Sequence, residues 1–262
     1  MGYVFNLKDT IEYSKWFEKP HNRSVLALEK KLMTDMLQPS KGETILDIGC
    51  GTGESLVPYL EMGLSVTGVD PSKYMLDCAI KRLANRAELR MCFAENLPFD
   101  DNSFNYASFF TSLEFTDDPK MALEEACRVA KDKIFIGILN SYSINAFSIR
   151  IKKHFSETLY SHAKFFNVWE IKKILKELLG DVPISWNTVC EFPFRSCIIA
   201  NKFDKADFTI KYPFSPFVGI VVTLIPRFRT KPLAIKYSAS QTGSAIAGKP
   251  VLGGSIHGSP SL

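Results

Sequence analysis

The stretch Asp47-Ile48-Gly49-Cys50-Gly51-Thr52-Gly53 constrains the fold of this chain more than any other. Three glycines at alternate positions follow a short apolar run at 44–48 and precede a segment of helical character at about 54–62. Glycines in such a turn let the backbone approach a ligand where any Cβ would collide. A strand, a glycine-rich loop and a helix in this order therefore predict a ligand site at the edge of a parallel sheet.

Strand and helix signals alternate on both sides of this loop. Apolar runs predict strands at 44–48, 64–69, 89–93, 105–110 and 133–139, with helices between them. Such alternation implies a parallel sheet with helices on both faces. Two more strands are expected at 182–190 and 214–225. They follow a helix that Asn167 and Glu170 open as a capping box and Gly180 ends.

The segments around this core predict the domain organisation. Residues 1–40 are expected to form an N-terminal helical cap, with Leu28, Leu32 and Met36 on one face of a helix that Pro39 ends. Residues 41–237 form the main domain, in which the aromatic-rich stretches at about 141–166 and 192–213 are expected to act as a lid. Residues 238–262 are rich in Ser, Gly and Ala and lack periodicity, which predicts a disordered tail.

Composition narrows the function classes. A net charge of +4 is too small for an extended nucleic-acid footprint, so no nucleic-acid partner is expected. The longest apolar run, 217–225, is far below the roughly 20 residues that span a bilayer, and no signal peptide is evident. The six cysteines form no CxxC pair, which argues against a metal site and fits a reducing cytoplasm. We therefore expect a cytoplasmic protein without a membrane span.

Asp47 separates two interpretations of the glycine loop. Its carboxylate is expected at the mouth of the ligand site, where the pyrophosphate of a dinucleotide would meet a like charge. The glycine spacing also departs from the GxGxxG of dinucleotide binders. S-adenosylmethionine (SAM) carries an ammonium and a sulfonium instead, and an acid suits both. The alternative is a tight turn that binds no ligand.

Asp70 is the second element of the predicted site. It ends the second predicted strand, where an acid is placed to accept hydrogen bonds from both hydroxyls of a ribose. Pro71 stops the strand, and Ser72 can cap the next helix. Alone, Asp70 could equally be a capping acid. Together with the glycine loop, it indicates a nucleoside ligand.

These residues resemble a known family. The run 45–53 resembles motif I of class I SAM-dependent methyltransferases, in the type 11 group that includes the ubiquinone/menaquinone-biosynthesis enzymes. The segments 94–99, 117–119 and 125–129 match further parts of that pattern, and the resemblance covers about 43–140. It implies a Rossmann-like α/β fold with a mostly parallel seven-stranded sheet, an antiparallel last strand and helices on both faces. It also implies SAM as cofactor.

The resemblance assigns roles in the cofactor site. Asp47 and the glycines Gly49, Gly51 and Gly53 would hold the methionine end of SAM, with Cys50 as a small filler in the loop. The remaining roles fall to Asp70 at the ribose, Pro71 and Met75 near the adenosine, Ala94 with its N–H toward the adenine, Phe110 or Thr111 along the sulfonium, and Tyr13 in a helix that closes over the cofactor.

Three positions depart from the family pattern. Phe93 stands where the group often has an Asp that contacts the adenine amino group, and Glu95 is the candidate to replace that contact. Glu114 stands where many relatives have a His, so it is a candidate general base, the alternative being a solvated surface residue. Lys131-Asp132-Lys133 replaces a usual Pro-Gly-Gly turn.

Three hypotheses remain for what the protein does with SAM. Aromatic residues concentrate after the core strands, which favours a small acceptor that is apolar or aromatic. A macromolecular acceptor and a non-catalytic SAM-binding module are the alternatives. The basic residues between Arg150 and Lys176 could attract an anionic acceptor or simply form a solvated helix face. Oligomeric state does not follow from the sequence.

Overall fold

The computed structural model describes residues 2–143, 162–189, 209–210 and 212–224, and the structural statements below concern these residues. Residues 1–226 form one compact unit, and residues 227–262 lie outside the described residues. The predicted tail and most of the two predicted lid stretches therefore also lie outside them.

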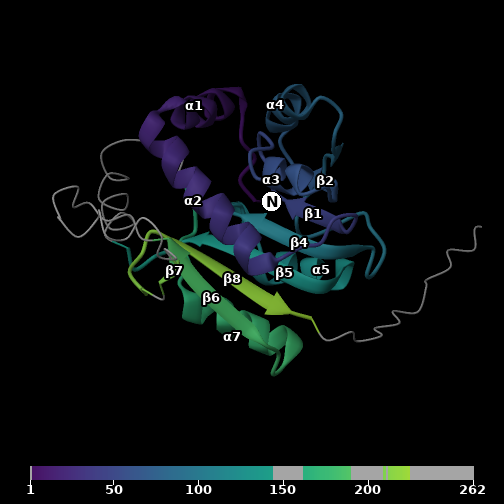
Figure 1. Ribbon diagram of the computed structural model, residues 1–262, viewed down its shortest axis with the longest axis vertical. Helices are drawn as coiled ribbons and strands as arrows, with labels where there is room; N and C mark the ends of the chain where they lie inside the picture. Colours follow the sequence, from purple (N-terminus) through teal and green to yellow (C-terminus); the bar gives the residue numbers. More distant parts are fainter. Residues whose placement is uncertain (1, 144–161, 190–208, 211, 225–262) are drawn as a thin grey trace, which may run out of the picture. The chain divides into compact units, whose positions relative to one another are not determined.

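The strands form one sheet in the order β3-β2-β1-β4-β5-β8-β6-β7 (Figure 1). The strands β1 to β5 run parallel, whereas β8 is antiparallel to both of its neighbours, β5 and β6. The mostly parallel sheet with an antiparallel last strand is thus confirmed, and a two-residue strand, β7, adds to the seven expected. The bounds are β1 Thr44–Ile48, β2 Ser65–Val69, β3 Glu88–Arg90, β4 Phe104–Phe110, β5 Ala130–Leu139, β6 Ile184–Val189, β7 Thr209–Ile210 and β8 Phe217–Thr223.

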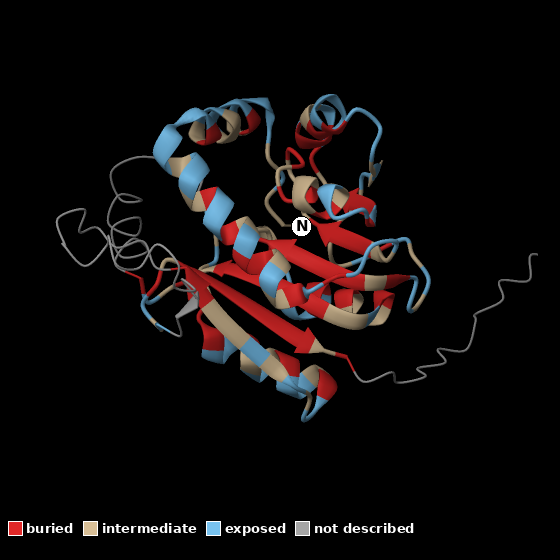
Figure 2. Ribbon diagram, viewed as in Figure 1, coloured by how far each residue is buried: buried red, intermediate tan, exposed pale blue. Residues whose placement is uncertain are grey.

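Helices cover both faces of the sheet, as the alternating pattern predicts. One apolar cluster joins α2 (Pro20–Leu37), α3 (Leu56–Glu61) and α4 (Lys73–Leu83) to one face. A second cluster joins α5 (Pro119–Val129) and α7 (Val168–Leu179) to the other. Figure 2 shows the central strands β1, β4, β5 and β8 as largely buried, whereas β6 is partly exposed. The helix α1 (Leu7–Glu18) precedes α2, and the short 3₁₀ helix η1 (Leu113–Phe115) follows β4.

Local capping explains where several helices begin. The Asn167 side chain accepts from the Glu170 N–H, and the Glu170 carboxylate accepts from the Asn167 N–H, which confirms the predicted capping box. Ser72 caps α4 through the Met75 N–H, also as expected. Such caps satisfy backbone donors that the first helical turn leaves unpaired.

The buried face of α2 includes only part of the apolar stripe at 28, 32 and 36. Leu28 is exposed, and the buried apolar residues of α2 are Leu26, Leu32, Met33 and Leu37. Each step of four residues advances about 40° around a helix, so two steps from 28 to 36 drift by about 80°. Residue 28 therefore lies outside the buried face, which residue 32 shares.

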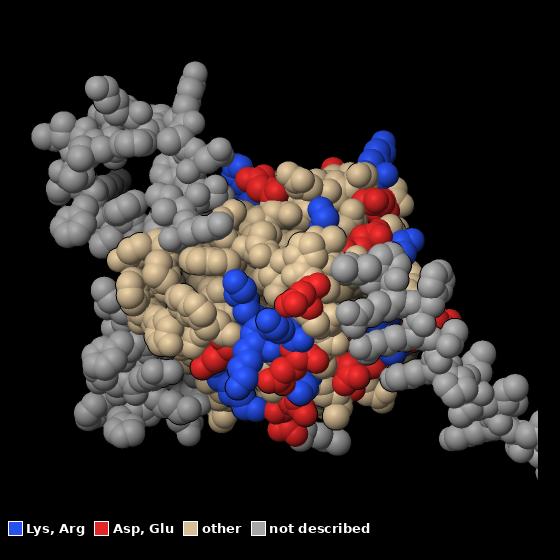
Figure 3. Space-filling view, turned by 90° about the horizontal axis from the view of Figure 1, so that it is seen from below, with Lys and Arg blue, Asp and Glu red and all other residues tan. Residues whose placement is uncertain are grey.

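The exposed surface carries mixed charge. Figure 3 shows Lys and Arg interspersed with Asp and Glu on the face seen from below. On the α7 side, Lys120 pairs with Glu177 at 3.0 Å and Lys176 pairs with Asp181 at 3.2 Å. Among the basic residues of α7, Lys176 thus has an acidic partner. In the described part of the chain, no helix is both long and apolar enough to cross a bilayer.

Candidate functional site

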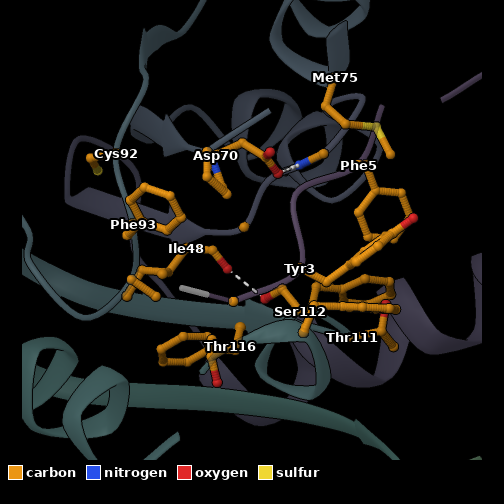
Figure 4. Close-up of a pocket in the computed structure, with 18 of the residues that line it drawn as sticks. Tyr3, Phe5, Ile48, Asp70, Met75, Cys92, Phe93, Thr111, Ser112 and Thr116 are labelled. Carbon is orange, nitrogen blue, oxygen red and sulfur yellow. Dashed lines mark hydrogen bonds between the residues drawn. The ribbon is translucent and has the colours of Figure 1, made fainter. Parts of the chain in front are cut away.

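The strand order creates a switch point between β1 and β4. The chain moves outward from β1 through β2 to β3 and then returns to β4 on the other side of β1. In open α/β sheets, ligands bind at the carboxyl ends of the strands beside such a point. A pocket lies there, lined by the glycine loop, the ends of β2 and β4, the loop after β3 and the N-terminal segment (Figure 4).

The glycine loop is fixed against the end of β4. Gly49 has a φ of 76°, and a Cβ at this position would lie 2.4 Å from the Ser112 Cβ. The Ser112 hydroxyl donates to the Ile48 carbonyl at 2.5 Å. Gly51, with a φ of 52°, lies against the Tyr13 ring. At Gly49, only glycine combines a positive φ with such a close approach to Ser112.

Asp70 connects the glycine loop to the start of α4. Its Oδ2 accepts from the Gly51 N–H and its Oδ1 from the Ser72 N–H, both at 2.8 Å. Burial raises the pKa of Asp70 to about 6, although these two hydrogen bonds oppose the rise. A carboxylate has about four acceptor positions, so two remain for a ligand in the pocket. The predicted placement of Asp70 at the tip of β2 agrees with the structure.

Asp47 requires a correction. Its carboxylate is fully buried and accepts from the Ser108 hydroxyl and the Ser55 hydroxyl, each at 2.5 Å. Burial raises the pKa of Asp47 to about 6 against these bonds. Side chains alternate along a strand, so residue 47 faces α3, on the same side as its register partner Ser108. The carboxylate therefore lies behind the glycine loop rather than at the mouth of the pocket.

Most other predicted cofactor residues meet in the pocket. Its walls include Tyr13, Gly49, Gly51, Asp70, Pro71, Met75, Ala94, Glu95, Phe110 and Thr111. Cys50 and Gly53 do not line it. Cys50 is buried close to Gly68, and a Cβ on Gly53 would lie 3.1 Å from the Leu83 side chain of α4. These two residues serve packing behind the loop.

Glu114 is neither exposed nor part of the pocket wall. Its side chain is fully buried, and its Oε1 accepts from the Leu139 N–H at 2.6 Å. Its Oε2 has no hydrogen-bond partner within the described ranges. Burial raises the pKa of Glu114 to about 7. A general base must reach the proton that it removes. Catalysis by Glu114 thus stays a prediction, which would require the acceptor to reach this buried carboxyl.

The N-terminal segment contributes a wall that the sequence analysis missed. The Tyr3 N–H donates to the Phe115 carbonyl at 3.0 Å, and the Ser72 hydroxyl donates to the Phe5 carbonyl at 2.6 Å. The Phe5 and Phe115 rings lie 4.9 Å apart, edge to face. The segment therefore crosses from η1 to the start of α4. These contacts join residues more than 60 positions apart and have no local signal.

The loop after β3 adds Cys92, which the sequence did not predict, to the pocket wall. β3 ends at Arg90, earlier than the predicted strand, so Cys92 and Phe93 fall in the loop and line the pocket. The Glu95 Oε1 accepts from the Asp117 N–H at 2.8 Å, which orients its carboxylate. At the end of β4, Thr111 has a φ of 52°. Such a backbone conformation is strained for a β-branched residue, and strain of this kind clusters at functional sites.

The described side chains that line the pocket carry negative charge only. Among the described lining residues, the ionisable carboxylates are Asp70 and Glu95, and there is no Lys, Arg or His. A pyrophosphate would find no cation here, whereas a cationic ligand would be favoured. Within the described ranges, no group of three or more His, Cys, Asp or Glu side chains is arranged to hold a metal ion.

Comparison with known proteins agrees with this geometry. A methyltransferase-domain model of type 11 matches residues 46–136. An uncharacterised protein of Methanocaldococcus jannaschii is 35% identical over 169 residues, which cover 64% of this chain and 76% of that protein. A demethylmenaquinone methyltransferase of Paenarthrobacter aurescens is 35% identical over 102 residues. That match spans only 39% of this chain and 40% of the relative.

Solved structures share the fold. A SAM-dependent methyltransferase of Thermotoga maritima, described as a possible histamine N-methyltransferase, superimposes with a TM-score of 0.65 at 26% identity. The match covers 83% of this chain and 96% of that one. A magnesium protoporphyrin IX methyltransferase of Synechocystis with bound S-adenosylhomocysteine gives 0.59 at 11% identity over 83% and 96% of the two chains, and shows the fold alone. Together with the strand order and the glycine loop, these similarities place the chain in the class I SAM-dependent methyltransferase family, type 11.

Proposed function

We propose that this protein transfers the methyl group of SAM to a small acceptor that is apolar or carries an aromatic ring. The observation that carries the proposal is Asp70, held by the Gly51 and Ser72 N–H groups at the switch point of the sheet. This places a carboxylate and a glycine turn side by side, in a pocket without a cationic side chain among its described residues.

The residues of the pocket fit SAM. Asp70 would accept hydrogen bonds from the ribose hydroxyls, and Pro71 and Met75 would pack beside the adenosine. Ala94 and Glu95 would lie at the adenine, and Phe110 and Thr111 near the sulfonium. Asp47 would act indirectly, because its bond to Ser55 fixes the segment between the glycine loop and α3. The methyl of SAM is already activated by its sulfonium, so the protein chiefly supplies alignment and excludes water.

The aromatic wall supports the acceptor class. Tyr3 stacks on His162 with ring centroids 3.9 Å apart and contacts Phe5 edge to face at 5.5 Å. Phe5 continues to Phe115, so rings line the pocket beside the end of β4. Aromatic faces and edges pack well against flat apolar molecules.

The pocket is narrow as it stands. Its volume is about 80 Å³, whereas small-molecule sites usually enclose about 300–1,000 Å³. The residues from Gly2 to Phe5 form part of its wall. SAM and acceptor would therefore enter as this N-terminal segment shifts, and its return would exclude water.

Calorimetric titration with SAM, NAD and NADP tests the cofactor. We expect binding of SAM alone, in the micromolar range, and binding of NAD in place of SAM would contradict the proposal. Mass spectrometry for a methyl gain, with phenols, quinols and aromatic amines as acceptors, tests the reaction. Methyl gain confined to protein or RNA substrates would contradict the small acceptor.

Replacement of Tyr3 tests the acceptor wall. Tyr3→Ala should reduce acceptor turnover far more than SAM affinity, because Tyr3 lies on the side of η1 rather than at Asp70. The exposed Tyr74→Ala on α4 is a matched control and should change neither. Equal loss of SAM binding and turnover in Tyr3→Ala would place this ring in the cofactor site.

A further inference from the structure

A second hollow, separate from the cofactor pocket, also borders α1. Its volume is about 420 Å³, and it is lined by residues of α1, α2 and α4 and by Glu54, which follows the glycine loop. The two cavities share no lining residue. Tyr13 of α1 lines the cofactor pocket, whereas Ser14 and Phe17 line this hollow, and the Tyr13 and Phe17 rings contact each other edge to face at 4.7 Å.

Positive charge converges on the hollow from two helices. Lys30 of α2 pairs with the Glu54 Oε2 at 2.8 Å, and Arg82 of α4 binds the Glu54 Oε1. The Glu54 carboxylate thus forms ion pairs with both cations. The Lys30 and Glu54 side chains are only 16% and 22% exposed, so water compensates little of this charge.

A third cation completes the group. The Arg23 Nε donates to the Phe17 carbonyl at 2.9 Å, which fixes the guanidinium beside the hollow. No carboxylate lies within ion-pair distance of Arg23 in the part of the chain that the structure describes. Glu18 is the second acid on the wall, so three cations face two carboxylates.

The electrostatics favour an added anion. Burial, together with the nearby charge of Arg82, lowers the pKa of Lys30 to about 8. Burial likewise lowers the pKa of Arg82. An anion in the hollow would reverse both effects, because an opposite charge at short range stabilises the protonated forms. Arginine also offers paired N–H donors that match phosphate and carboxylate oxygens.

We propose that this hollow binds the phosphate or carboxylate group of a small molecule through Arg23, Lys30 and Arg82. The Ser14 hydroxyl lies on the wall as a further donor. Leu26 and Ala27 provide an apolar patch for the body of the ligand. The occupant would tie α1 and α2 to α4. The site is separate from methyl transfer, so it stands or falls independently of the proposed function.

Calorimetric titration of the SAM-free protein tests the site. Inorganic phosphate and succinate are the two probes, with sodium chloride at equal ionic strength as the reference. Stronger binding of phosphate or of succinate identifies the group that the site prefers. In parallel, NMR titration of the Lys30 Nζ should show its pKa rise when the bound probe is present. If neither probe bound more strongly than chloride, the proposal would be overturned.

Substitutions at Arg23 and Lys31 test whether the probes bind in this hollow. Arg23→Gln should weaken probe binding by about tenfold, because a charged hydrogen-bond donor is lost. Lys31→Gln is the matched control on α2, since Lys31 is 67% exposed and pairs with Asp35 outside the hollow. Arg23→Lys keeps the charge and should restore part of the affinity, which separates charge from the contact with Phe17. Equal weakening by Arg23→Gln and Lys31→Gln would contradict the site, as would full affinity in Arg23→Gln.

Discussion

Replacing Glu114 with Gln should remove a pH dependence of folding stability. Glu114 belongs to η1 and is fully buried against the end of β5, and burial raises its pKa from 4.5 to about 7. A carboxyl whose folded pKa lies above its unfolded value binds its proton more tightly when folded. Its stabilising contribution is therefore complete below pH 4.5 and is lost as pH rises through about 7.

The size of the effect on the unfolding free energy follows from the raised pKa of Glu114. Each pKa unit corresponds to about 1.4 kcal/mol, so ionising Glu114 in place costs roughly 3 kcal/mol above pH 7. A Gln side chain has the same shape, stays neutral and can still accept from the Leu139 N–H. Its amide N–H groups would occupy the position of Oε2, which has no partner within the described residues. That adds a penalty of about 1–3 kcal/mol, but one that does not vary with pH.

The informative measurement is the difference in unfolding free energy between Glu114→Gln and the natural protein, from urea unfolding between pH 4 and pH 9. We expect the variant to gain about 3 kcal/mol relative to the natural protein across this range. Taking the difference cancels the contributions of Asp47 and Asp70, whose pKa values are also raised. Glu124→Gln, at an exposed position on α5, should show no such trend. A pH-independent difference for Glu114→Gln would refute the reasoning.

Three further predictions concern the cofactor loop and the tail. SAM affinity should weaken as pH falls below about 6, because Asp70 then becomes protonated, and titration of Asp70→Asn should give weaker binding without this pH dependence. Gly49→Ala should lower stability by about 2 kcal/mol or more, measured by urea unfolding, because its Cβ would meet Ser112. Gly42→Ala also has a positive φ but open space around it, so it should cost only about 1 kcal/mol, and equal losses would argue against the Ser112 contact. A chain ending at Tyr237 should melt within about 2 °C of the full chain, since residues 238–262 lack the apolar periodicity that offsets ordering entropy; a large loss of stability would show that the tail docks on the domain.

The sequence by itself determined the features that depend on short-range backbone demands. The glycine loop could be predicted because a strand, a turn with positive φ and a helix follow one another within a few residues. Asp70 could be predicted because the end of a strand fixes where the next residue lies. The alternation of strands and helices likewise predicted a mostly parallel sheet, and the capping box at Asn167 marked the start of α7.

Only the tertiary structure decided what faces what across the sheet. Asp47 turns behind the loop because Ser55 and Ser108 meet its carboxylate there, and no local pattern places those two hydroxyls together. Tyr3 enters the pocket wall through a contact with Phe115, more than 100 residues away. Burial of a charged group costs free energy that a sequence does not display. Burial of the Glu114 carboxyl, like the assembly of the pocket wall, therefore depended on packing between distant segments.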